Sequence, residues 1–185
     1  PKVFMNIKKN LKSTKFKILE IKNLKLNKII KINIKNKKKL GSDRIANAIG
    51  AKKLKNCLII DFGTATTFDV IKNGIYEGGV IAPGVNLSIK NLSQATALLP
   101  LIKLKTHQKN YGKNTIEALN AGFVWGYEGL LNNIIDKIIS RSKIKYKILL
   151  TGGYANFFNK MIKKKVAIDQ DITIKGIANA YKELI

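Results

Sequence analysis

The chain has 185 residues and is 45% hydrophobic, which is enough to bury one sizeable core, or one domain with part of another. No apolar run approaches the roughly 18 residues that a membrane span needs, so the sequence predicts no span and no membrane partner. The single cysteine, Cys57, excludes an internal disulfide and favours a cytoplasmic location.

The net charge of +24 would suit a nucleic-acid partner, but the charge is not gathered into one predicted binding face. Lysine supplies every basic residue except Arg44 and Arg141, and it occurs in predicted strands, helices and loops alike. We interpret this as a compositional bias and expect no specific nucleic-acid partner. Where lysine fills nearly every basic position, an arginine indicates a site that needs a planar, bidentate donor.

The first 40 residues contain no glycine and precede every motif described below. Their alternating apolar residues predict two short strands, at 17–21 and 29–34. The chain begins with Pro1 and not with an initiator methionine, so we expect this stretch to be the end of a domain that is incomplete here.

From residue 41 onward, predicted helices and strands follow one another with short connections. Ser42 is expected to cap a helix that Gly50 ends, and Pro83 is expected in the first turn of a later helix. Asn73-Gly74 predicts a tight hairpin turn. The predicted helices cover residues 42–50, 83–92, 115–140 and 176–184, and the predicted strands cover residues 58–61, 66–72, 75–81 and 147–150.

One motif, Asp61-Phe62-Gly63-Thr64-Ala65-Thr66-Thr67, lies where a buried strand ends in a tight turn. Gly63 allows the backbone to approach a ligand, and the Thr64 hydroxyl and nearby amides can face phosphate oxygens. Asp61 is placed to hold a cation. The alternative is an ordinary hairpin rich in β-branched residues, because short motifs give many false matches.

A second motif, Gly41-Ser42-Asp43-Arg44, begins a predicted helix. In a functional interpretation Asp43 accepts the proton of a substrate alcohol and Arg44 binds a substrate carboxylate. The helix N-terminus and the neighbouring arginine would keep Asp43 ionised. The alternative is a helix cap beside a surface charge.

Two further motifs carry glycine next to a predicted helix. Gly152 and Gly153 follow a buried strand and could lie against adenosine, although such glycines also serve packing alone. Gly112-Lys113-Asn114-Thr115 begins the long helix, and its alternative is a plain loop and cap. Along that helix, three glycines predict close packing against another helix: Gly122, Gly126 and Gly129.

The order of these motifs resembles that of the type III pantothenate kinases, from about residue 40 to the end of the chain. The matching segments are Leu40–Arg44, Asp61–Thr67, Gly78–Gly84, Thr96–Pro100, Gly112–Thr115 and Thr151–Gly153. The resemblance implies an α/β, actin-like (ribonuclease H-like) fold with a mixed sheet flanked by helices. Residues 1–52 would be the remnant of an N-terminal actin-like domain, and residues 53–185 a C-terminal one.

The resemblance also implies a function. The family transfers phosphate from ATP to pantothenate, the first step of coenzyme A biosynthesis, and works as a homodimer with Mg²⁺ and a monovalent cation such as K⁺. Asp43 would be the proton acceptor in a pantothenate pocket formed by Gly41, Ser42, Asp43 and Arg44. Thr115 would reach pantothenate in the neighbouring protomer.

For the nucleotide, the resemblance places Gly63 and Thr64 at ATP, with Gly152 and Gly153 beside it and Asp61 at the K⁺ ion. The family begins with an Asp-x-Gly-Asn-Thr motif that this sequence lacks. We therefore expect the chain alone to be inactive. The alternatives are a regulatory or nucleic-acid-binding protein on a decayed kinase fold, which the charge favours and the intact site residues oppose, and another kinase of the same fold.

Overall fold

The computed structural model describes residues 2–12, 15, 18–105 and 110–184. Its centre is a six-stranded mixed sheet in the order β1-β4-β3-β2-β5-β6. The β2–β3 and β3–β4 pairs are antiparallel, and the other pairs are parallel. The strands are β1 (Lys31–Ile32), β2 (Cys57–Phe62), β3 (Ala65–Lys72), β4 (Ile75–Pro83), β5 (Lys147–Gly152) and β6 (Val166–Ile168).

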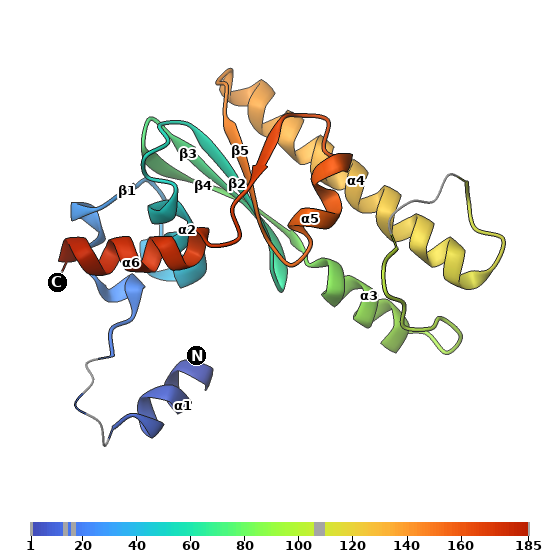
Figure 1. Ribbon diagram of the computed structural model, residues 1–185, viewed down its shortest axis with the longest axis horizontal. Helices are drawn as coiled ribbons and strands as arrows, with labels where there is room; N and C mark the ends of the chain where they lie inside the picture. The colour runs from blue at the N-terminus through green and yellow to red at the C-terminus, as the bar shows by residue number, and fades with distance from the viewer. Residues whose placement is uncertain (1, 13–14, 16–17, 106–109, 185) are drawn as a thin grey trace.

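Helices lie on both sides of this sheet. Figure 1 shows α2 and α6 on one side, α4 and α5 on the other, and α1 apart from the rest. The α-helices are α1 (Lys2–Asn10), α2 (Ser42–Gly50), α3 (Val85–Gln94), α4 (Thr115–Ser142), α5 (Ala155–Phe158) and α6 (Ile172–Leu184). Short 3₁₀ helices cover Ile21–Asn23, Leu26–Lys28, Lys37–Lys39 and Asn159–Met161.

The sheet separates two hydrophobic clusters, because successive side chains of a strand point to opposite faces. In β2, Leu58 and Ile60 belong to the cluster beneath α4, and Cys57 and Ile59 to the cluster beneath α2 and α6. All four are fully buried. A strand buried on both faces reads as a continuous apolar run, which explains the pattern of this segment.

Helix α2 packs closely against α6. A side chain at Gly176 of α6 would collide with the backbone carbonyl of Ala46, so this contact requires glycine. On the sheet side of α2, Ile45 and Ile49 are buried. The first residues of α2, which include Asp43 and Arg44, are thereby fixed relative to the sheet.

The mixed sheet flanked by helices agrees with the expected fold class. Most predicted elements are confirmed within a few residues, and the Asn73-Gly74 turn has the positive φ angles, 52° and 74°, of a tight hairpin. Residues 30–51 share the α2/α6 cluster with the sheet, and the boundary between residues 52 and 53 stays a prediction.

Several predictions were wrong near the start of the chain. Of the strand predicted at 17–21, residue 17 lies outside the described residues, residues 18–20 have no regular structure, and Ile21 begins a 3₁₀ helix. The strand predicted at 29–34 shortens to Lys31–Ile32. Alternation alone does not make a strand where too few neighbouring backbone groups are available for pairing.

Other differences concern helix boundaries. Ser42 is the first residue of α2, and Gly41 is its N-cap without a side-chain bond. Pro83 is the last residue of β4, where it pairs with Ala65, and Gly84 precedes α3. The last helix begins at Ile172, four residues before the predicted start, and the predictions omitted α1 and β6.

Candidate active site

Asp61 lies near the end of β2, between two neighbouring strands. It pairs with Thr67 of β3 and Thr151 of β5 in the sheet register. A Cβ atom at Gly152 would lie 2.7 Å from Asp61 Oδ1 and 2.7 Å from the Phe62 carbonyl oxygen. Gly152 also has a φ of +85°, which side-chain-bearing residues rarely adopt. The backbone at the end of β5 therefore lies directly against the Asp61 carboxylate.

The other Asp61 oxygen connects to α2. Asn47 Nδ2 donates a hydrogen bond to Asp61 Oδ2 at 2.8 Å, and Thr173 Oγ1 of α6 donates to Asn47 Oδ1 at 2.5 Å. Asn47 is fully buried. One amide side chain thus joins α2, β2 and α6 beside the predicted cation ligand.

Asp43 occupies the first turn of α2, one helical turn before Asn47, and its side chain is exposed. Its Oδ1 accepts a hydrogen bond from the Arg44 backbone N–H at 2.9 Å. Negative charge is stabilised at this end of a helix by the unsatisfied N–H groups. An exposed carboxylate held at a helix start can receive a proton from a bound hydroxyl.

Arg44 extends inward from α2 toward β3. Its Nε donates to Asp69 Oδ1 at 2.7 Å, and the Arg44 side chain is only 14% exposed. The same Asp69 oxygen accepts a hydrogen bond from the Tyr76 hydroxyl at 2.8 Å. Asp69 itself is fully buried. Arg44 therefore has an acidic partner within the protein in addition to its predicted substrate role.

The Gly63–Thr64 turn connects β2 to β3 and is exposed. It is closed by a hydrogen bond from the Gly63 N–H to the Ala65 carbonyl at 3.1 Å. A side chain at Gly84, just before α3, would collide with the Thr64 carbonyl. The predicted phosphate turn thus lies against the start of α3, where helix N–H groups favour anions.

Gly152 ends β5 and Gly153 begins the turn that follows, at the same edge of the sheet. The Gly153 N–H donates to the Phe62 carbonyl at 3.1 Å, next to the Gly63–Thr64 turn. Beyond it, the Tyr154 hydroxyl donates to Asn86 Oδ1 of α3 at 2.6 Å. Backbone turns from three parts of the chain therefore meet where β2 ends.

The electrostatics connect the three carboxylates. Burial raises the pKa of Asp61, its hydrogen bond from Asn47 lowers it, and the charge of Asp43 raises it further. Burial also raises the pKa of Asp69, against the lowering effects of the Arg44 charge and the Tyr76 hydrogen bond. The charge of Asp43 also raises the pKa of Asp69, so Asp43 acts on both of the other carboxylates.

Metal-binding groups are sparse. In the part of the chain that the structure describes, no group of three or more His, Cys, Asp or Glu side chains could hold a metal ion.

Among the described helices, none is both long and apolar enough to cross a membrane.

Thr115 lies elsewhere, at the start of α4. Asn114 caps this helix by accepting a hydrogen bond from the Glu117 N–H at 3.0 Å. Figure 1, with the long axis of the molecule horizontal, shows the start of α4 and helix α2 far apart. Within one chain, the structure does not bring Thr115 to Asp43.

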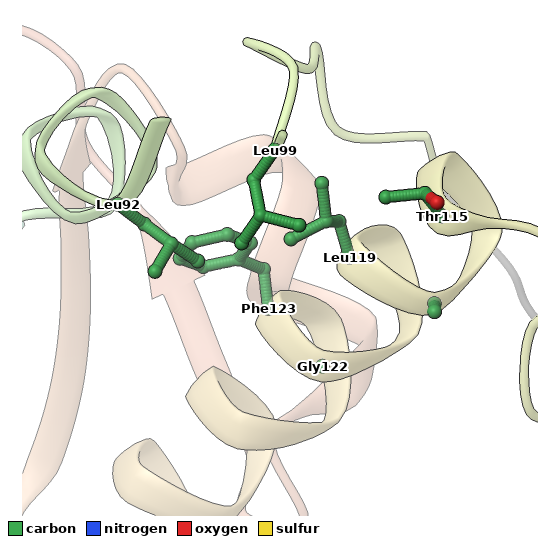
Figure 2. A pocket seen from close by; sticks show the side chains of 7 residues that line it. Leu92, Leu99, Thr115, Leu119, Gly122 and Phe123 are labelled. Atoms are coloured by element: carbon green, nitrogen blue, oxygen red, sulfur yellow. The ribbon is translucent and has the colours of Figure 1, made fainter. Parts of the chain in front are cut away.

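Thr115 instead lines an apolar pocket of about 390 Å³ between α3 and α4. In Figure 2 the side chains of Leu92, Leu99 and Phe123 approach one another, and Thr115 lies at the other end of the group.

Close packing of the α4 glycines is not found within the described chain: a Cβ atom at Gly122, Gly126 or Gly129 would meet nothing within 4 Å.

Sequence reasoning missed Asn47, Asp69 and Tyr76. The signal for Asp69 was its place in β3. Asp69 is two residues after Thr67 and so lies on the same face of the sheet, and Thr67 pairs with Asp61 on that face. An acidic residue in a strand that is otherwise buried requires a buried partner. Asn47 could have been found from its spacing, four residues after Asp43 on the same face of α2.

Comparison with solved structures identifies the fold. A crystal structure from Campylobacter jejuni, described as a conserved Baf family transcriptional activator, matches with a TM-score of 0.66 and 24% identity over 96% of this chain and 78% of that one. The Alp12 filament structure matches with a TM-score of 0.52 and 16% identity over 76% of this chain and 51% of that one. These matches agree with the expected α/β, actin-like fold.

Sequence comparison identifies the family. The profile of the type III pantothenate kinases matches residues 1–137. A type III pantothenate kinase of Pelagibacter ubique (strain HTCC1062) is 50% identical over 97% of this chain and 73% of its own length. One from Ruegeria sp. (strain TM1040) is 39% identical over 77% of this chain and 56% of its own length. The chain therefore belongs to the type III pantothenate kinase family.

Proposed function

We propose that this protein phosphorylates pantothenate with ATP. The observation that carries the proposal is the meeting of two motifs: α2 holds Asp43 and Arg44 against the sheet, and Asn47 ties the same helix to Asp61 where the glycine turns converge. The relatives named as pantothenate kinases support the choice of substrate. The rival function in nucleic-acid binding has only the overall charge in its favour.

The proposed reaction is a direct transfer. The primary hydroxyl of pantothenate donates its proton to Asp43, and its oxygen forms a bond to the γ-phosphorus of ATP. The bond between that phosphorus and the bridging oxygen breaks, so ADP leaves with the electron pair. Positioning and electrostatic stabilisation supply the catalysis, and no covalent enzyme intermediate is needed.

The ATP phosphates would lie at the Gly63–Thr64 turn, with Gly152 and Gly153 beside the nucleoside. The turn lies against the start of α3, which favours negative charge. Arg44 would bind the pantothenate carboxylate. Its planar guanidinium suits a carboxylate better than a lysine would.

Two cations belong to the proposal. Asp61 Oδ1, beside the Phe62 carbonyl, offers the oxygen ligands that a K⁺ ion takes, and so fits the monovalent site. Because no acidic cluster occurs among the described residues, Mg²⁺ would be held mainly by the ATP phosphates. When bound, these cations offset the negative charge of the phosphates.

A homodimer is the proposed assembly. Large apolar side chains are exposed along α3, α4 and the segment between them, and one of them, Leu98, is 88% exposed. Together with the apolar pocket and the open glycine face of α4, they form a surface that a second copy could cover. In such a dimer, Thr115 would contact the pantothenate that is bound to the neighbouring protomer. The exposed residues are Leu87, Leu92, Leu98, Leu101, Ile116 and Trp125.

The test is an assay of ADP release with pantothenate, ATP, Mg²⁺ and K⁺. It should be run on the 185-residue chain and on a chimera that adds the part of the Pelagibacter relative outside the matched region. Pantothenate-dependent ADP release that is enhanced by K⁺ supports the proposal. A chimera that is folded but uses only other acceptors would contradict it. The proposed location is the cytoplasm, where these substrates occur.

A further inference from the structure

We propose that Asp69 is the positioning residue for Arg44, and that it gives the site its selectivity for a substrate carboxylate. This inference rests on the proposed function, because it assigns a role within the pantothenate pocket. Asp69 would touch neither substrate nor nucleotide. It would act by fixing the orientation of the Arg44 guanidinium.

The first observation is the burial of the Asp69 charge. The Asp69 side chain has no exposed surface, yet it lies in β3 among apolar neighbours. Its Oδ1 accepts from Arg44 Nε at 2.7 Å and from the Tyr76 hydroxyl at 2.8 Å, and its Oδ2 accepts from Thr67 Oγ1 at 3.4 Å. A buried carboxylate is tolerated only when it is paired and hydrogen-bonded in this way.

The second observation is the shape of the space around the guanidinium. A Cβ atom at Gly79 would lie 2.8 Å from Arg44 Nη2, so glycine leaves room for this group. On another side, the Tyr76 ring lies with its centroid 5.9 Å from Arg44 Cζ. β3 and β4 therefore bound the guanidinium on these two sides, and the Asp69 bond to Nε sets its rotation.

The third observation is an unused donor. Among the described residues, Arg44 Nη2 is buried and has no hydrogen-bond partner. An arginine has five N–H donors in a rigid fork, and the bond to Asp69 engages only the Nε donor. Buried donors are rarely left unpaired, which points to an acceptor that the bound substrate supplies.

A purely structural ion pair would explain the burial of Asp69 but not the unused Arg44 donor, which belongs to the same helix, α2, as Asp43. Arg44 directly follows Asp43, whose carboxylate accepts its backbone N–H. A rotation of the guanidinium would therefore misplace the carboxylate-binding group relative to the proton acceptor. The Asp69 bond to Nε fixes the orientation of the Arg44 guanidinium, so the remaining N–H donors keep a fixed direction. A rigid, planar set of donors favours a planar anion such as a carboxylate.

The experiment measures binding of two ligands to the 185-residue chain by calorimetry. Pantothenate carries the carboxylate, and pantothenol carries a hydroxymethyl group in its place. The variant is Asp69→Asn, and the matched control is Asp136→Asn, an exposed residue of α4 that pairs with Lys164. Melting temperatures and circular dichroism follow the fold of each variant.

We expect Asp69→Asn to weaken pantothenate binding about tenfold and to leave pantothenol binding within about twofold, since a charge-assisted contact is lost for one ligand only. Asp136→Asn should change neither. Equal weakening of both ligands by Asp69→Asn would show a merely structural role and overturn the inference. Wild-type protein that binds neither ligand would contradict the proposed function itself, and the inference with it.

If Asp69→Asn does not fold, Tyr76→Phe provides the second variant. It removes one donor from the same Asp69 oxygen and keeps the aromatic ring beside the guanidinium. We expect a smaller loss of the preference for pantothenate, about threefold, consistent with one neutral hydrogen bond. An unchanged preference in a folded Tyr76→Phe protein would also overturn the inference.

Discussion

Asn47 Nδ2 donates a hydrogen bond to Asp61 Oδ2 at 2.8 Å, although 14 residues separate the two along the chain. This bond ties the helix that carries Asp43 to the strand that ends at the glycine turns. Because Thr173 donates to the other end of the same amide, α6 is part of the connection. The substrate motif and the predicted cation ligand are thereby held in one rigid frame.

The first prediction concerns this amide. Asn47→Ala removes both hydrogen bonds and leaves Thr173 and a partly buried carboxylate without their partner, so we expect the free energy of unfolding to fall by about 2 kcal/mol. Urea denaturation measures the change. The matched control is Asn156→Ala on the exposed side of α5, which should change stability by less than about 0.5 kcal/mol. Equal stability of the two variants would contradict the bridging role of Asn47.

The second prediction concerns Asp61 and pH. Burial raises the pKa of Asp61, so above that raised value the folded protein carries a carboxylate that is less well solvated than in the unfolded chain. Asp61→Asn should therefore be more stable than wild type at pH 7, and its affinity for K⁺ should be lost. The advantage in stability should shrink as the pH falls through the raised pKa and vanish below the unfolded value of about 3.9.

Urea midpoints of the wild type and Asp61→Asn, taken between pH 4 and pH 8, test this prediction. The control is Asp136→Asn, since Asp136 is an exposed carboxylate. An advantage that grows as the pH falls would show that the sign of the Asp61 effect is the reverse of the one expected here.

The third prediction concerns catalysis. Asp43→Asn should reduce pantothenate phosphorylation in the chimera by about 100-fold or more, the usual contribution of a proton acceptor, and should leave the fold intact. Binding of pantothenate should change little, since Asn keeps the shape of the side chain. A fall in turnover of less than about tenfold would show that Asp43 is not the main base.

The fourth prediction tests whether Thr115 acts in the neighbouring protomer. Thr115→Ala should weaken pantothenate use, and mixing it with Asp43→Asn should restore activity, because one site of each mixed dimer combines a normal Asp43 with a normal Thr115. With free exchange, about a quarter of the sites should be intact. If both residues served the same protomer, mixing would restore nothing. Each variant mixed with wild type is the control.

The fifth prediction concerns Gly79. A methyl group there would collide with the Phe68 carbonyl and approach Arg44 Nη2, so Gly79→Ala should destabilise the fold by about 1–3 kcal/mol. The control is Asn156→Ala on the exposed side of α5, which should change stability by less than about 0.5 kcal/mol. Thermal melting of both variants measures the difference. Similar melting temperatures would contradict the close fit at Gly79.

The sequence by itself determined the elements whose cause is local. Asn73-Gly74 fixes its own turn, the apolar run at residues 57–60 can only be a buried strand or helix, and α4 shows its helical spacing over many residues. The order of the motifs also identified the family, because the motifs resemble those of the type III pantothenate kinases in both residue types and sequence order. The short elements before residue 40 were predicted poorly, since a two-residue strand such as β1 exists only through pairing with β4.

Only the tertiary structure decided which residues share the site. The place of Asp69 in a buried strand and the spacing of Asn47 from Asp43 mark both residues, but their roles depend on contacts with Arg44 and Asp61, which lie 25 and 14 residues away. The distance between Thr115 and Asp43 is likewise set by the tertiary structure, because the start of α4 lies far from α2. A buried charge or amide is stable only when a partner reaches it, and that partner is chosen by packing between distant segments, which no local pattern records.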